Sequence, residues 1–330
     1  MKLGVDVFSL RFNDWSADEL LDYSHSIGVD VVHFSEVHFF ESLDRSYLEQ
    51  VKRHADELGI AIEVGMGSIC PTSTTFSPAR GTASEQLAEM LHVAALMGSP
   101  AMRCYMGSNA DRRTELPFAA HQAATVETLH SVRSLAVDLG VKIAIENHAG
   151  DMQGRELAAL IEQAGPDFVG ACVDTGNPLW VAESPFVTLE HIAPHVLMCH
   201  VRDTALWRHP LGAVAQWVAI GEGTIGIDKW TQILRGCCPD INYTLEVITS
   251  LAPRVLNFLE PEFWVAYPDT PAEEFARFLQ LVEAGRPYTE PILTADAATM
   301  PPEYRTALAW QQRAKLEQSV RYCRNVLQIA

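Results

Sequence analysis

The sequence predicts a single closed (β/α)8 barrel followed by a helical extension at the C-terminus. Eight short apolar runs rich in Val, Ile and Leu alternate with amphipathic stretches, and several of these stretches end at a glycine. Such alternation is typical of a parallel sheet covered by helices, and eight units are enough to close a barrel. An open doubly wound sheet is the competing fold, but no Gly-x-Gly-x-x-Gly motif follows the first run.

Each barrel strand is expected where an apolar run is followed by a turn. The runs are short for helices, and their β-branched residues favour buried strands. They lie at residues 3–9, 29–36, 60–67, 101–107, 142–148, 169–176, 196–203 and 242–249.

The helices between the strands are marked by their ends. Ser16 precedes the first amphipathic stretch, and Glu19 three residues later completes a capping box. A glycine directly follows each of the later stretches, as is common at helix C-termini. The helices are expected at 16–27, 44–58, 84–97, 118–139 and 154–164.

The barrel is expected over residues 1–250, and residues 251–330 form an extension that closes and covers it within the same domain. Residues 251–271, rich in proline and aromatic residues, are interpreted as a loop. A helix is expected at 272–284 and a terminal helix at 302–327, which carries five Lys or Arg against two Glu. This basic helix could dock on the barrel or on a neighbouring subunit, so a homo-oligomer is one expectation.

Composition and charge exclude several classes of protein. The chain has 48% hydrophobic and 20% charged residues, as expected for a globular protein with a large core. A net charge of −18 argues against a general nucleic-acid partner, which would favour a basic face, although a local basic patch could survive. No apolar run approaches the roughly 20 residues that span a bilayer, so no membrane partner is expected. The seven cysteines include no Cys-x-x-Cys motif, which indicates a reducing, cytoplasmic location.

Four acidic or imidazole residues stand near the ends of the last four apolar runs. They are Glu146 in KIAIENH, Asp174 in VGACVDTG, His200 in VLMCHVRD and Glu246 in NYTLEVIT. Any one of them could be a buried polar group paired with a neighbour, because an unpaired buried carboxylate is costly. All four on consecutive strands, at the barrel end where active sites lie, predict a divalent-cation site. We expect Mn2+, with Mg2+, Co2+ or Zn2+ as alternatives.

Strand periodicity places two further side chains at this site. Alternate residues of a barrel strand face inward, so His148 shares the face of Glu146 and Arg202 that of His200, each one layer nearer solvent. An imidazole there could act as a general acid or base near neutral pH, or could only support Glu146. The planar fork of Arg202 suits a carboxylate or two vicinal oxygens of a substrate.

The loops after the sixth and seventh strands supply weaker candidates for substrate binding. Asn177, Trp180, His209 and Glu222 fall there, on the expected rim of the active site. Aromatic rings pack well on sugar faces, although a single tryptophan in such a loop is as easily a buried anchor. Glu36 with His38, and Arg103 with Tyr105, could also reach substrate hydroxyls at the ends of the second and fourth strands.

Taken together, the runs IENH, VDTGN, CHVRD, GEGTIG and LEV resemble the xylose-isomerase-like TIM-barrel family. That family contains sugar isomerases and epimerases, inosose dehydratases and AP-endonuclease-type enzymes, and the resemblance covers roughly residues 1–251. It implies metal ligands at Glu146, Asp174, His200 and Glu246. It also implies that Glu146 and Glu246 flank the substrate carbon and move its proton. His148 is a further catalytic candidate on the strength of its position and its imidazole.

The expected function is a metal-dependent sugar isomerase or epimerase acting on a keto sugar or related polyol through a metal-stabilised enediolate. The alternative is a lyase on the same barrel: a keto-glycoside lyase, a dehydratase or a decarboxylase. An AP-endonuclease-type repair enzyme is a third reading, disfavoured because Asn177 stands where many members of the family have a histidine. A non-catalytic barrel is a fourth, disfavoured because all four ligand positions are filled.

Overall fold

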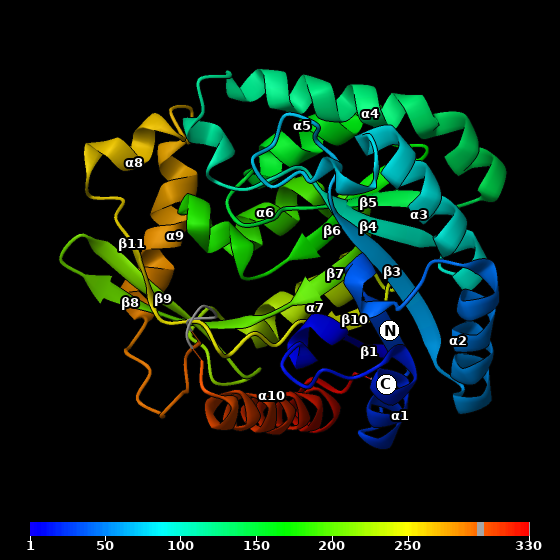
Figure 1. Cartoon of the computed structure of the whole chain (residues 1–330). Coiled ribbons are helices and arrows are strands. Elements are labelled where there is room, and N and C mark those ends of the chain that lie inside the picture. Colours follow the sequence, from blue (N-terminus) through cyan, green and yellow to red (C-terminus); the bar gives the residue numbers. More distant parts are fainter. Residues whose placement is uncertain (296–299, 330) are drawn as a thin grey trace.

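The computed structural model describes residues 1–295 and 300–329. Its centre is a closed barrel of parallel strands, in the order β1-β10-β7-β6-β5-β4-β3-β2 (Figure 1). The barrel strands are β1 Leu3–Asp6, β2 Val31–Phe34, β3 Ala61–Ser68, β4 Ala101–Tyr105, β5 Lys142–Glu146, β6 Val169–Asp174, β7 Val196–Val201 and β10 Tyr243–Leu245. The predicted (β/α)8 barrel is confirmed. Every strand begins inside its predicted run, and only β3 extends past the end of its run, by one residue.

Helices surround the barrel and cover the outer face of its sheet. They are α1 Ala17–Ser26, α2 Arg45–Leu58, α3 Ala83–Met97, α4 Phe118–Leu139, α5 Gly154–Ala164, α6 Pro185–Ile192 and α7 Ile227–Cys237. The capping box of Ser16 and Glu19 is present. Gly59 ends α2 at a φ of +71°, a left-handed conformation that favours glycine. Short turns of helix are η1 Val7–Leu10, η2 Val37–Phe39, η3 Pro78–Arg80, η4 Asp111–Arg113, η5 Asn177–Val181 and η6 Ala193–His195.

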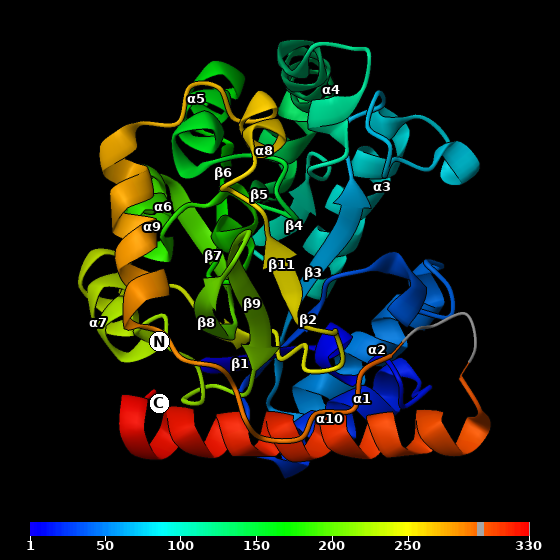
Figure 2. The same cartoon turned by 90° about the vertical axis from the view of Figure 1, so that its left-hand side faces the viewer.

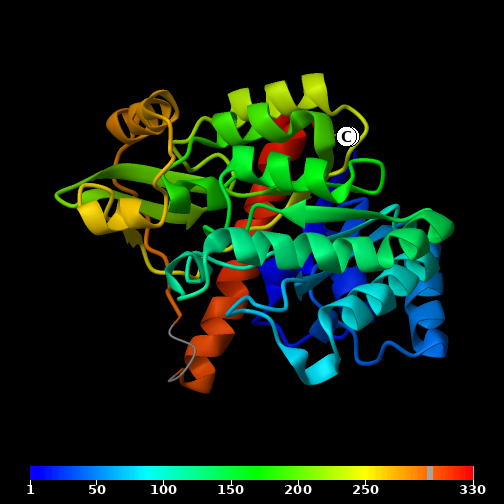
Figure 3. The ribbon, with the colours of Figure 1, turned by 90° about the horizontal axis from the view of Figure 1, so that it is seen from above.

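The segment after β7 forms a hairpin that the sequence interpretation missed. Strands β8 Asp203–His209 and β9 Gly212–Val218 pair in antiparallel fashion, and β11 Arg254–Leu256 adds a third strand beside β9. Viewed from above, this small sheet and its helices project from one side of the barrel (Figure 3). The sheet has a core of its own, in which Leu206, Leu256 and Phe258 are buried.

The interpretation of residues 251–271 as a loop was wrong in part. The segment contains β11 and a short helix, α8 Pro261–Val265. Its aromatic residues are the reason, because Phe258 and Phe263 pack in the core of the small sheet together with Phe278 of α9 Ala272–Ala284. The helix α9 begins and ends as predicted.

The terminal helix α10 Pro302–Tyr322, continued by the π-helical turn η7 Cys323–Leu327, runs across the barrel (Figure 2). It docks on its own chain: the Phe12 amide donates to Gln312 Oε1 over 3.0 Å, and the Ile220 amide donates to Ser319 Oγ over 3.0 Å. Leu316 is fully buried in the main core. Among the described residues, no helix is long and apolar enough to cross a membrane.

The interior of the barrel is layered as strand alternation requires. Ala144, Cys172 and Met198 form a small apolar cluster with Ala101. Each of the first three stands two residues before a predicted ligand on its own strand, so the ligands occupy the next inward-facing layer. The apolar cluster therefore lies beneath the layer that carries Glu146, Asp174 and His200.

Candidate metal centre and active site

The four predicted ligands come together at the C-terminal end of the barrel strands. One ligand atom from each of Glu146, Asp174, His200 and Glu246 can be chosen so that all lie within 4.8 Å of one another. Strand register accounts for this convergence, because Asp174 lies opposite His200 in the β6–β7 pair. Glu246 directly follows β10, and its amide donates to the Val201 carbonyl over 3.0 Å. All four side chains are buried.

The donor set fits a divalent cation. Within the described part of the chain, Asp174 Oδ2, His200 Nδ1 and Glu246 Oε2 are buried and take part in no hydrogen bond. Buried polar atoms are normally paired, and Asp174 Oδ2 and Glu246 Oε2 are paired with Arg202. The imidazole nitrogen His200 Nδ1 faces the carboxylates without a hydrogen bond, an arrangement that a metal ion would satisfy. Three carboxylates and one imidazole suit Mg2+, Mn2+ or Zn2+, and the separations suit ligands around one ion.

Two arginines form ion pairs with the carboxylates of this centre. Arg202 Nε lies 2.8 Å from Asp174 Oδ2, and its Nη2 pairs with Glu246 and lies 3.4 Å from Glu146 Oε1. Arg103 pairs with Glu146 from the other side and lies 3.4 Å from Glu36 Oε1. Both guanidinium groups are almost fully buried, so their attraction to the carboxylates is weakly screened.

The pKa values of Asp174 and Glu246 are shifted in opposite directions. Burial, together with the nearby charges of Glu146 and Glu246, raises the pKa of Asp174 to about 7 against the attraction of Arg202. Burial would also raise the pKa of Glu246, but Arg202 and His200 lower it to about 2. Like charges this close are stabilised by nearby positive charge. Arg103 and Arg202 supply part of it, and a bound divalent ion would supply more.

Behind His200 lies a second layer of polar residues that the sequence interpretation missed. His200 Nε2 lies 2.7 Å from His33 Nδ1 and 3.5 Å from Asp6 Oδ2, and all three side chains are fully buried. A partner on one ring nitrogen fixes which nitrogen is free to bind a metal, here Nδ1. The signal was present, because Asp6 and His33 each interrupt an apolar run of β1 or β2.

A cavity of about 310 Å3 opens above this centre. Glu246 and Arg202 line its floor, and His148, Asn177 and Trp180 line its walls. Further lining side chains are Arg11, Glu36, Arg103, Trp217 and Arg254. Glu146 is fully buried and does not line the cavity, because Arg103 and the amide of Asn177, which donates to Glu146 Oε1 over 3.0 Å, cover it.

His148 is held in one orientation on the cavity wall. Its ring stacks on Tyr105 with centroids 3.7 Å apart, and its Nδ1 donates to the Gly107 carbonyl over 2.8 Å. Because a carbonyl can only accept, Nδ1 carries the proton and Nε2 is the free acceptor. Burial, together with the positive charge of Arg103, lowers the pKa of His148 to about 4 against the attraction of Glu146. The imidazole is therefore neutral at pH 7.

Two of the predicted substrate-binding residues lie away from the cavity. Glu222 pairs with Lys315 of α10 over 2.9 Å and accepts a hydrogen bond from Tyr288 over 2.6 Å, so it ties a loop to the extension. His209 stands at the tip of the β8–β9 hairpin, where its Nδ1 accepts from the Leu211 amide. The β8–β9 hairpin, which the sequence interpretation treated as a rim loop, carries His209 at its tip, and Glu222 follows the hairpin. Neither residue lines the cavity, so their role in substrate binding stays a prediction.

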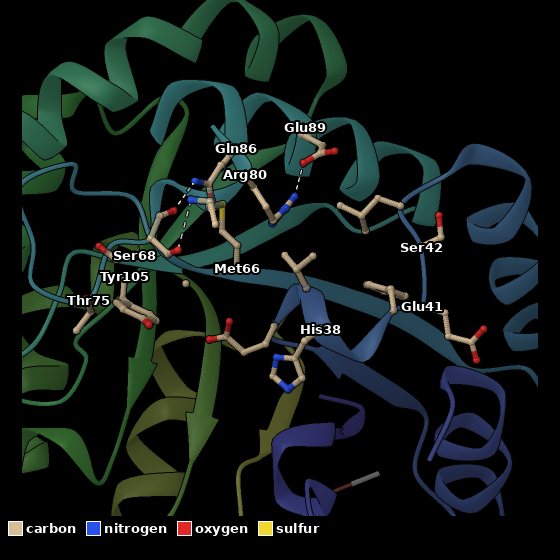
Figure 4. A pocket seen from close by; sticks show the side chains of 17 residues that line it. His38, Glu41, Ser42, Met66, Ser68, Thr75, Arg80, Gln86, Glu89 and Tyr105 are labelled. Carbon is tan, nitrogen blue, oxygen red and sulfur yellow. Dashed lines mark hydrogen bonds and ion pairs between the residues drawn. The ribbon is translucent and has the colours of Figure 1, made fainter. Parts of the chain in front are cut away.

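A larger groove of about 580 Å3 adjoins the cavity (Figure 4). It lies between the loop after β2 and the N-terminal part of α3, and it contains the ion pair of Arg80 and Glu89. Glu36 lines both the groove and the cavity, and Tyr105 separates the groove from His148. The residues at the ends of β2 and β4 thus form the boundary between the two hollows.

The structure is a (β/α)8 barrel with a buried group of three carboxylates and one histidine beneath a cavity. The sequence profile of the xylose isomerase-like TIM barrel family matches residues 21–280, and the chain belongs to that family. The 3-oxo-isoapionate decarboxylase of Pectobacterium atrosepticum is 22% identical over 232 residues, which are 69% of this chain and 76% of that protein.

Solved structures share the fold at low sequence identity. A D-psicose 3-epimerase determined with D-fructose has a TM-score of 0.61 at 13% identity and covers 99% of both chains. A probable 3-DHS dehydratase from Bacillus anthracis has a TM-score of 0.58 at 13% identity over 74% of this chain and 92% of that one. A barrel protein from Mycobacterium smegmatis in complex with magnesium has a TM-score of 0.61 at 13% identity over 85% and 96%. The similar proteins thus include a decarboxylase, an epimerase and a probable dehydratase.

Proposed function

We propose that this chain is a divalent-metal-dependent sugar isomerase or epimerase that acts on a keto sugar or related polyol. The convergence of Glu146, Asp174, His200 and Glu246 beneath a cavity supports the proposal most strongly. The proposed ligands are these four, with Mn2+ as the expected ion. When bound, the ion would polarise the substrate carbonyl and make the neighbouring C–H bond more acidic.

The chain's own residues would then move the proton. Glu246 is ionised because Arg202 and His200 lower its pKa, and it faces the cavity. His148, neutral and free at Nε2, is the proposed partner that returns or delivers a proton. Glu146 is covered by Arg103 and Asn177, so we propose it as a ligand and assign the proton transfers to Glu246 and His148.

Deuterium exchange tests this proposal. Wild-type protein loaded with Mg2+ is incubated in D2O with a panel of ketoses and inosose, and the substrates are followed by NMR. We expect deuterium beside the carbonyl with at least one compound, and none with Glu246→Gln. Glu127→Gln, which changes an exposed carboxylate on α4, serves as the matched control. Turnover without any exchange would contradict an enediolate of the substrate.

A second candidate is a lyase on the same barrel, and one group of side chains favours it. Arginines line the cavity from several sides, and loss of CO2 from a keto acid leads to the same kind of enediolate. The decarboxylase similarity at 22% identity agrees with this alternative. Release of CO2 from a β-keto sugar acid, measured with wild-type protein and Glu246→Gln, separates it from isomerisation.

A further inference from the structure

Arg11 stands at the end of η1, directly above the C-terminal end of β1. Its Nη1 donates to the Phe8 carbonyl over 3.1 Å, and its Nη2 donates to Ser250 Oγ over 2.6 Å. The guanidinium also lies over the rings of Phe8 and Phe12, with centroid distances of 4.6 and 4.9 Å. These contacts hold a half-buried cation in a fixed position on the cavity wall.

Among the arginines that line the cavity, Arg11 is half-buried without an ion pair. Arg103 and Arg202 are each paired with carboxylates of the chain, and Arg254, which like Arg11 forms no ion pair within residues 1–295 and 300–329, is exposed. Acidic residues outnumber basic ones by 42 to 24, so an unpaired half-buried arginine is unusual here. Burial, with the repulsion of Arg202, lowers the pKa of Arg11 to about 10, so it is still charged at neutral pH.

A guanidinium has more N–H groups than the two that Phe8 and Ser250 use, and the remaining ones can bind an anion. Glu246, the proposed base, lines the same cavity as Arg11. An anion on Arg11 would therefore belong to the molecule that Glu246 acts on. A guanidinium fork fits a carboxylate or a phosphate, so the experiment below includes a ligand of each kind.

We propose that Arg11 binds a carboxylate of the substrate, so that the natural substrate is a sugar acid or keto acid. The proposal rests on the proposed function and narrows its substrate class. In this role Arg11 sets specificity. Arg202, by contrast, is held by the carboxylates of the metal centre.

The test compares two polyols that differ in one group. D-gluconate and D-sorbitol are titrated into metal-loaded wild-type protein by calorimetry. We expect gluconate to bind at least about tenfold more tightly, and we expect Arg11→Gln to abolish that preference while sorbitol binding is unchanged. Arg11→Lys keeps the charge and should retain part of the preference. Arg53→Gln removes an exposed charge on α2 and should retain all of it.

Three results would overturn the proposal. Equal affinity of wild-type protein for gluconate and sorbitol would show that the cavity does not prefer a carboxylate. A preference for gluconate that persists in Arg11→Gln would show that another residue binds the carboxylate. Tighter binding of sorbitol 6-phosphate than of gluconate, lost in Arg11→Gln, would make the ligand a phosphate. Metal content is measured in each sample, so loss of the metal, which would contradict the proposed function, is distinguished from loss of the anion contact.

Discussion

His148 is the residue whose proposed role is most specific. Its Nδ1 is used by the Gly107 carbonyl and its ring is stacked on Tyr105, so Nε2 alone is free for proton transfer. A general acid or base of this kind contributes about 10²–10⁴-fold in rate. We expect His148→Gln to lower kcat by an amount in that range while metal content is unchanged. Steady-state kinetics with elemental analysis checks both quantities.

The outcomes of that experiment are distinct. Loss of metal from His148→Gln would mean that the imidazole supports Glu146, the alternative that strand periodicity left open. An unchanged kcat would assign the proton chemistry to the glutamates.

At the scale of single residues, the position of polar residues in apolar runs was sufficient to predict that these four side chains come together. Glu146, Asp174, His200 and Glu246 interrupt apolar runs, and parallel strands bring such positions to one barrel end. Alternation does not show what covers a side chain. Glu146 is buried because Arg103 of the neighbouring strand β4 contacts it. Contacts between particular side chains of this kind could not be predicted from the sequence.

Among the structural elements, α5 begins against a buried carboxylate, that of Glu183, which lies just before α6. Glu183 accepts hydrogen bonds from the Gly154 amide, 3.0 Å away, and from the Thr188 hydroxyl. Burial raises the pKa of Glu183 from 4.5 to about 7. The folded state therefore holds a proton that the unfolded state releases, and the free energy of unfolding should fall as the pH rises from about 4.5 to 7.

Glu183→Gln should reduce that pH dependence. The neutral amide keeps an acceptor for Gly154 and has no charge to bury, so the variant should lose less stability than wild type between pH 5 and pH 8. The expected difference is on the order of 1–3 kcal/mol, measured by urea unfolding at each pH. The exposed Glu57→Gln on α2 is the control, and equal slopes for all three proteins would refute the expectation.

Element boundaries were predicted well where caps marked them and poorly where pairing was non-local. The capping box at Ser16 and the glycine after α4 are local signals, and α4 begins and ends where expected. The β8–β9–β11 sheet depends on pairing Val255 with Val214 across a long stretch of chain. A short strand such as β11 has too little alternation of its own to be recognised.

For the whole molecule, we predict that the barrel and its extension unfold as one domain. Leu316 of α10 is fully buried in the same core as the barrel strands. Leu316→Ala should therefore lower the free energy of unfolding by about 2–5 kcal/mol, with a single cooperative transition. Val326→Ala, at a position 53% exposed in η7, should have little effect. A separate early transition for the extension would contradict a single domain.

The basic terminal helix was predicted to dock on the barrel or on a second subunit. It contacts its own barrel through Gln312 and Ser319, and its outer face leaves Trp310 66% exposed. A homo-oligomer through this helix stays a prediction, which the mass of the particle in solution would test. The sequence could not decide between the two arrangements because both bury the same amphipathic stretch.

The metal content of the purified protein tests the central claim most directly. Asp174→Asn replaces one charged metal ligand with a neutral amide. The amide oxygen can still accept hydrogen bonds from the backbone amides of Gly176 and Asn177, so the turn after β6 should be preserved. We predict one divalent ion per chain in wild-type protein and in the exposed control Asp138→Asn, and a loss of that ion, with a loss of activity, in Asp174→Asn. A wild-type protein that is fully active without metal, or an Asp174→Asn variant that binds the ion as tightly as wild type, would contradict the account.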